Sequence, residues 1–130
     1  TGFTTAAHIA RAALDSTAFQ AAEVVDALVS DVGTGLRAIR VDGGMSVNDA
    51  FLQFQSDILS TPVVRPKETE STAVGASFAA GVGAGLYSHG DVASLWRKDR
   101  EFVPHMDSRT REHLRARWNE AVERSLNWEH

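Results

Sequence analysis

The residues with the clearest chemical potential form the run Arg-Val-Asp-Gly-Gly-Met-Ser-Val-Asn over positions 40–48. This pattern predicts a strand that leads through two glycines into a helix. In open α/β sheets, ligands bind beyond the carboxyl ends of the strands, where helix N-termini direct free N–H groups outward. Glycines at such a turn let a nucleotide approach the backbone closely. A tight turn that needs positive φ and binds nothing explains the same residues, so both interpretations stay open at this point.

The other candidate groups carry less chemistry. The glycine repeat over residues 81–85 lacks the spacing of a phosphate-binding loop and lies in a helical pattern, which favours close helix packing instead. The five histidines show no metal-ligand spacing, and no cysteine is present to complete a zinc site. Glu68, Glu70 and Asp91 form a loose carboxylate group that surface loops explain. From these residues alone, the glycine turn is a candidate ligand-binding edge, and no catalytic residues or metal site accompany it.

Alternating helices and strands would position the candidate turn. Apolar spacing predicts helices over 5–29, 48–59 and 73–86, strands over 38–42 and 62–65, and a last helix near the C-terminus. We expect Gly33 and Gly35 to stop the first helix, Ser46 or Asn48 to cap the second, and Asp107 or Ser108 to cap the last. This alternation favours parallel pairing and an α/β fold. Residues 87–107 look irregular, with aromatic anchors at Tyr87, Trp96 and Phe102. Two short strands would leave both sheet edges open, so we expect the chain to be part of a larger protein.

The predicted helix over residues 73–86 is unusually rich in glycine. Each glycine in a helix interior costs about 1 kcal/mol relative to alanine. We therefore expect Gly75 and Gly81 to admit a closely packed neighbouring backbone. Ser71 or Thr72 is the expected cap of this helix.

Composition excludes several classes of function. The 130 residues are 43% hydrophobic and 23% charged, which is typical of a globular domain. The absence of cysteine excludes a disulfide scaffold and a cysteine nucleophile. A net charge of -4 argues against nucleic acid as the main partner. No apolar run is long enough to span a bilayer, and we expect a cytoplasmic protein.

Several segments together resemble the C-terminal part of the glycerol kinases, within the carbohydrate kinases. The segments are residues 7–14, 18–20, 40–48, 53–59, 62–66, 72–76 and 118–128. Kinases for xylulose and gluconate share the Gly-Gly turn. The run Arg-Val-Asp-Gly-Gly-Met with Asn48 following is more similar to the glycerol kinases.

The resemblance implies a part of an actin-like (ribonuclease H-like) ATPase fold, in which two lobes with mixed sheets close over ATP. Residues 1–130 would be the C-terminal part of the second, nucleotide-binding lobe, with the upstream lobe absent. The reaction would convert ATP and glycerol to ADP and glycerol 3-phosphate, with Mg²⁺ held mainly through the nucleotide and the missing lobe. The general base and the glycerol contacts would lie in that lobe, so the chain alone would be inactive. The full-length protein would be a homo-oligomer.

The resemblance also implies which residues contact the nucleotide. Gly44 would let the nucleotide reach the backbone, and the Asn48 amide would donate to it and accept from it. Gly43 and Asp42 would support the turn. Two alternatives remain for the whole protein: another carbohydrate kinase, of the xylulokinase type, and a non-catalytic actin-like module that binds nucleotide as a scaffold.

Overall fold

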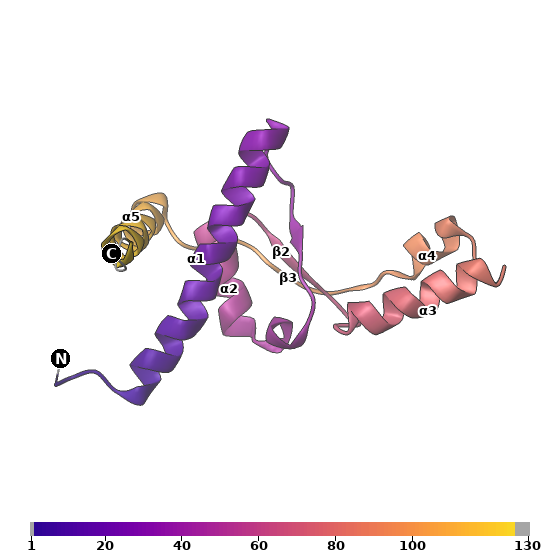
Figure 1. Cartoon of the computed structure of the whole chain (residues 1–130), viewed down its shortest axis with the longest axis horizontal. Coiled ribbons are helices and arrows are strands. Elements are labelled where there is room, and N and C mark those ends of the chain that lie inside the picture. Colours follow the sequence, from indigo (N-terminus) through magenta and orange to yellow (C-terminus); the bar gives the residue numbers. More distant parts are fainter. Residues whose placement is uncertain (1, 127–130) are drawn as a thin grey trace.

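Helix α1 (Ala6–Val32) is the longest element and crosses α2 in the view of Figure 1. The computed structural model describes residues 2–126. The helix begins after Thr5, whose backbone N–H donates to His8 Nδ1 at 3.1 Å. It ends at Gly33, which adopts the left-handed conformation with φ 72°. The predicted helix and its glycine stop are therefore confirmed, with three more residues at the C-terminal end.

A three-stranded mixed sheet lies at the centre of the chain, in the order β1-β2-β3. Strands β1 (Ile39–Arg40) and β2 (Val63–Pro66) pair in parallel, as the alternation of helices and strands predicted. Strand β3 (Lys98–Phe102) pairs with β2 in the antiparallel direction. The mixed sheet agrees with the fold that the resemblance implied.

The prediction of an irregular stretch over residues 87–107 is wrong, because the stretch contains both helix α4 (His89–Leu95) and strand β3. The strand has the sequence Lys-Asp-Arg-Glu-Phe, and only Phe102 is buried. A strand with one buried side chain lacks the apolar alternation that indicates strands. Its backbone pairing with β2 stabilises it instead.

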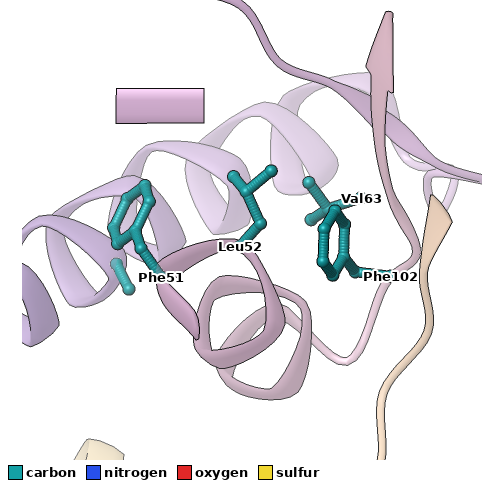
Figure 2. Close-up of a cluster of buried hydrophobic side chains, with 5 residues drawn as sticks. Phe51, Leu52, Val63 and Phe102 are labelled. Carbon is teal, nitrogen blue, oxygen red and sulfur yellow. The ribbon is translucent and has the colours of Figure 1, made fainter. Parts of the chain in front are cut away.

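Helix α2 (Asp49–Leu59) joins the two sides of the core, because it contacts α1 as well as strands β2 and β3. Figure 2 shows the buried cluster that results, with aromatic rings from α2 and β3 around aliphatic side chains. Its members are Ala18, Phe51, Leu52, Val63 and Phe102. Ser56 Oγ donates to the Phe102 carbonyl at 2.9 Å and so ties α2 to β3 at the edge of this core.

Helix α5 (Ser108–Ser125) packs on α1 through aromatic and polar contacts. It begins after Asp107, one of the two expected caps, whose Oδ1 accepts from the Thr110 N–H at 2.9 Å. The Trp118 indole stacks on Phe19 of α1, with ring centroids 5.2 Å apart. Its Nε1 donates to Glu23 at 2.7 Å. The final part of the matching segment over 118–128 lies outside the described residues.

Helices α3 (Ser71–Gly83) and α4 lie together on one side of the sheet, away from α1 and α2 (Figure 1). The expected caps of α3 are wrong, since Ser71 is already helical and Glu70 stands at the N-cap without a side-chain hydrogen bond. We expected Gly75 and Gly81 of α3 to admit a closely packed backbone, and within residues 2–126 neither glycine meets one. A Cβ at Gly75 would meet nothing within 4 Å, and one at Gly81 would meet the Tyr87 ring at 2.5 Å.

No helix within the described part of the chain combines the length and the apolar character that crossing a membrane requires.

Candidate functional site

The glycine turn, residues 42–48, leaves the sheet at the carboxyl end of β1. Strand pairing continues to Val41, whose N–H donates to the Val64 carbonyl at 3.1 Å. The Gly43 N–H then donates to the Thr69 carbonyl at 2.8 Å, in the loop that follows β2. The ends of the two parallel strands are thereby held together at one edge, the place where α/β folds bind ligands.

The two glycines of the turn differ in whether the backbone conformation requires glycine. Gly43 has φ 84° and ψ 175°, a region that side chains other than glycine rarely adopt. Gly44 begins the short 3-10 helix η1 (Gly44–Val47), has no positive φ, and is exposed. A Cβ at Gly44 would meet nothing within 4 Å. The fold of the described residues thus requires Gly43 but not Gly44, whose backbone is open to an approaching ligand.

Asn48 caps helix α2 with its side chain. Its Oδ1 accepts from the Phe51 N–H at 3.0 Å, and its own N–H donates to the Met45 carbonyl at 3.1 Å. The prediction that Ser46 or Asn48 caps this helix is resolved in favour of Asn48. Because Oδ1 already accepts the cap hydrogen bond, the amide NH₂ group (Nδ2) is the part of the side chain best placed to donate a hydrogen bond to a ligand.

Ser46 stabilises the turn from inside. Its side chain is buried, and its Oγ donates to the Gly43 carbonyl at 2.6 Å. The Ser46 N–H donates to the same carbonyl at 3.0 Å. Asp42 is exposed at the start of the turn. The four predicted site residues therefore lie along one continuous turn, with Ser46 beneath it.

Sequence reasoning missed Arg65 of β2, which contacts the turn from the sheet. Its Nη1 donates to the Ser46 carbonyl at 3.0 Å and to Asp49 Oδ1 at 2.8 Å, and its Nε donates to Asp99 Oδ2 at 2.8 Å. The hydrogen bonds that Arg65 donates to Asp99 and then to Asp49 raise the pKa of its guanidinium above the ordinary value. The available signal was a charged side chain directly after the apolar pair Val63 and Val64.

A cavity of about 760 Å³ lies away from the glycine turn. It is lined mostly by apolar side chains of α3, α4 and the residues that follow them, including Val74, Phe78, Tyr87, Leu95 and Trp96. None of residues 42–48 lines it. Among the loose carboxylates, Asp91 accepts hydrogen bonds from the Ser88 N–H and Oγ at 2.8 and 2.6 Å, which gives it a capping role in α4.

The part of the chain that the structure describes gathers no metal ligands of its own. Within residues 2–126, no three or more His, Asp or Glu side chains come together in a way that could hold a metal ion. A divalent ion at the glycine turn would need its ligands from elsewhere, such as nucleotide phosphates.

Known kinases match this chain in sequence. The profile of the FGGY family of carbohydrate kinases, C-terminal domain, matches residues 1–84. The glycerol kinase of Azorhizobium caulinodans is 50% identical over 129 residues, which are 98% of this chain and 26% of that protein. The glycerol kinase of Thermus brockianus is 50% identical over 125 residues, or 96% of this chain and 25% of that protein. The chain thus spans about a quarter of the length of the curated relatives it matches.

Solved structures agree with these matches. A crystal structure of Plasmodium falciparum glycerol kinase with ADP superposes with a TM-score of 0.83 at 40% identity, covering 99% of this chain and 26% of that one. Xylulose kinase from Lactobacillus acidophilus gives a TM-score of 0.80 at 22% identity, covering 98% of this chain and 26% of that one, and so shares the fold. The resemblance to the glycerol kinases and the α/β, actin-like fold are both confirmed. The chain belongs to the FGGY family of carbohydrate kinases.

Proposed function

We propose that this chain is the C-terminal, nucleotide-binding part of a longer glycerol kinase, called the parent kinase below. The parent kinase would transfer the γ-phosphoryl group of ATP to glycerol and release glycerol 3-phosphate and ADP. The observation that carries this proposal is the 50% identity to glycerol kinases over nearly the whole chain. Identity to the xylulose and gluconate kinases of L. acidophilus is only 22% and 24%, which favours glycerol over another acceptor.

The proposed contribution of this chain is to bind and orient the nucleotide. Gly44 would let the nucleotide reach the backbone, because no Cβ occupies the open space beside it. Asn48 would donate from Nδ2 while its Oδ1 keeps helix α2 capped. Gly43 and Asp42 would support the turn. Phosphoryl transfer depends mainly on such positioning and on charge neutralisation, so a domain can contribute without holding a catalytic residue.

The other requirements of the reaction are assigned to an upstream lobe. The described residues hold no group that fits Mg²⁺ as a direct ligand set, so we assign the ion to the nucleotide and the upstream lobe. The same lobe would supply the general base and the glycerol contacts. We place the parent kinase in the cytoplasm, which fits the absence of cysteine, and expect it to be a homo-oligomer without nucleic acid or membrane as a partner.

A coupled assay of ADP release tests the proposal. The parent kinase is mixed with MgATP and, in separate reactions, with glycerol, xylulose and gluconate. Turnover with glycerol far above the other acceptors is expected. Faster turnover with xylulose would favour a xylulokinase-type enzyme. Nucleotide binding with no turnover on any acceptor would favour a non-catalytic actin-like module.

The isolated chain is the matched control in the same assay. We expect no turnover from residues 1–130 alone, because the chain has no assigned base or acceptor site. Turnover well above background from this chain would contradict the assignment of the catalytic groups to another lobe.

A further inference from the structure

We propose that Arg65 is a positioning residue for nucleotide binding, which it serves by holding Asn48 in place. This inference rests on the proposed function of the glycine turn. Arg65 itself lies in strand β2 and would not touch the nucleotide. Its role would be to hold the backbone on both sides of Asn48 before the ligand arrives.

The hydrogen bonds of Arg65 bracket Asn48 along the chain. The Nη1 atom of Arg65 donates to the carbonyl of Ser46, two residues before Asn48, at 3.0 Å. The same atom donates to the carboxylate of Asp49, one residue after Asn48, at 2.8 Å. The 3-10 helix and the start of α2 are therefore tied to a single guanidinium group, and the side chain between them is restricted.

The guanidinium is held from its other side by strand β3. Its Nε donates to Asp99 at 2.8 Å, and its Cζ lies 5.6 Å from the centre of the Phe102 ring. The Arg65 side chain is only 14% exposed, so water competes little for these hydrogen bonds. Arginine suits this task because its planar fork serves several acceptors in fixed directions, which a lysine ammonium group cannot do.

This arrangement connects the rigid core to the ligand-binding edge. Phe102 belongs to the buried cluster, and β2 is the central strand of the sheet. A binding group held by such supports loses less conformational freedom when the ligand binds, and affinity rises accordingly.

Arg100 provides a matched control within the same cluster. Its Nη1 binds the other oxygen of Asp49 at 2.5 Å, and its Cζ lies 4.9 Å from the centre of the Phe102 ring. Its side chain is 57% exposed. Within residues 2–126 it donates no hydrogen bond to the backbone of the glycine turn. Replacing Arg100 therefore removes an ion pair with Asp49 and leaves the Ser46 contact intact.

The test measures MgADP affinity by calorimetric titration of the parent kinase, together with the KM for glycerol and the melting temperature. We expect Arg65→Met to weaken MgADP binding about tenfold, with the KM for glycerol within about twofold of the wild type. Arg65→Lys should restore much of the melting temperature without restoring the affinity. Arg100→Met should leave the affinity within about twofold of the wild type.

A double variant separates positioning from a general loss of stability. In the Asn48→Asp background, Arg65→Met should change the MgADP affinity by less than about twofold, because the group that it positions is already gone. A full tenfold effect in that background would overturn the inference. So would wild-type affinity in Arg65→Lys, which also decides the matter should Arg65→Met fail to fold.

Nucleotide binding by the wild-type parent kinase separates a failure of the proposed function from a failure of the role of Arg65. If the wild type binds no nucleotide, the proposed function fails and the inference fails with it. If the wild type binds MgADP and both Arg65 variants bind it equally well, only the role of Arg65 is overturned.

Discussion

Arg65 and Arg100 face each other across the antiparallel pair of β2 and β3, and one carboxylate binds both. The two oxygens of Asp49 accept from Arg65 Nη1 at 2.8 Å and from Arg100 Nη1 at 2.5 Å. Like charges directly opposite each other destabilise a sheet. Asp49 is the first residue of α2, so its ion pairs with the two arginines also attach the start of that helix to the sheet.

Replacing Asp49 should therefore cost more than the loss of an ordinary surface ion pair. We expect Asp49→Ala to lower the free energy of unfolding by about 1–2 kcal/mol. The substitution removes two ion pairs, leaves the two facing arginines to repel each other, and removes the acidic side chain from the first turn of α2. Urea unfolding of the parent kinase measures it. Asp15→Ala, which breaks the single pair of Asp15 with Arg11, is the control and should cost less than about 0.5 kcal/mol. Equal losses would contradict the bridging role.

The Asn48 side chain caps α2 with Oδ1, and in the proposed function it binds the nucleotide with Nδ2; two substitutions separate these roles. Asn48→Asp keeps the cap oxygen and removes the Nδ2 donor, so it should weaken nucleotide binding by about 1–2 kcal/mol with little change in stability. Asn48→Ala should lose similar affinity and, in addition, about 1 kcal/mol of folding stability. Separate titrations with nucleotide and glycerol, together with thermal melts, measure these effects. A change confined to glycerol would contradict the assignment.

Replacement by alanine should lower stability at Gly43 and nucleotide affinity at Gly44. Gly43→Ala should reduce stability by about 1–3 kcal/mol, because its backbone conformation is strained for any other residue. Gly44→Ala should leave the melting temperature nearly unchanged, because the new methyl group meets no protein atom. It should still weaken MgADP binding, because the methyl group would occupy the space proposed for the nucleotide. Unaltered nucleotide affinity in Gly44→Ala would remove this residue from the proposed site.

Gly81 is the glycine of α3 with a visible packing reason. A Cβ there would lie 2.5 Å from Tyr87 Cδ2, so Gly81→Ala must displace that ring from its edge contact with Phe78. Helix propensity alone favours alanine by about 1 kcal/mol. We expect Gly81→Ala to be neutral or destabilising in thermal melts and Gly75→Ala, which meets no neighbour in the described chain, to be more stable than it. Equal stabilisation by both substitutions would show that the Tyr87 ring moves at no cost.

Acid should weaken the start of α5 through Asp107. The Thr110 hydroxyl and then the Thr110 N–H donate to its carboxylate and hold the pKa of Asp107 below its ordinary value. The stabilisation is therefore present above the unfolded-state pKa of about 3.9 and is lost as the pH falls through the lower folded-state value. Asp107→Asn keeps a cap acceptor that does not titrate. Its unfolding midpoint in urea should fall less steeply than that of the wild type between pH 5 and pH 2, and parallel curves would contradict this role.

The sequence by itself determined the elements whose causes are local. Helix α1 and its stop at Gly33 depend on residues within a few positions of one another. So do the caps of α2 and α5, each of which the sequence limited to two candidates: Ser46 or Asn48, and Asp107 or Ser108. The same holds for the Gly-Gly turn after β1. Because these signals act between near neighbours, spacing and residue type were enough to predict them, and the family motifs could be recognised from the same segments.

Only the tertiary structure decided the features that join distant parts of the chain. Strand β3 carries charged residues and one buried ring, so its pairing with β2 left no local pattern to read. The Arg65 contacts reach Ser46 and Asp99, which lie 19 and 34 positions away. Within the described residues, Gly81 meets the Tyr87 ring where a backbone was expected, since sequence gives no means to distinguish an aromatic ring from a backbone as the neighbour. Long-range contacts depend on how the whole sheet assembles, and that assembly positions the glycine turn and its supports.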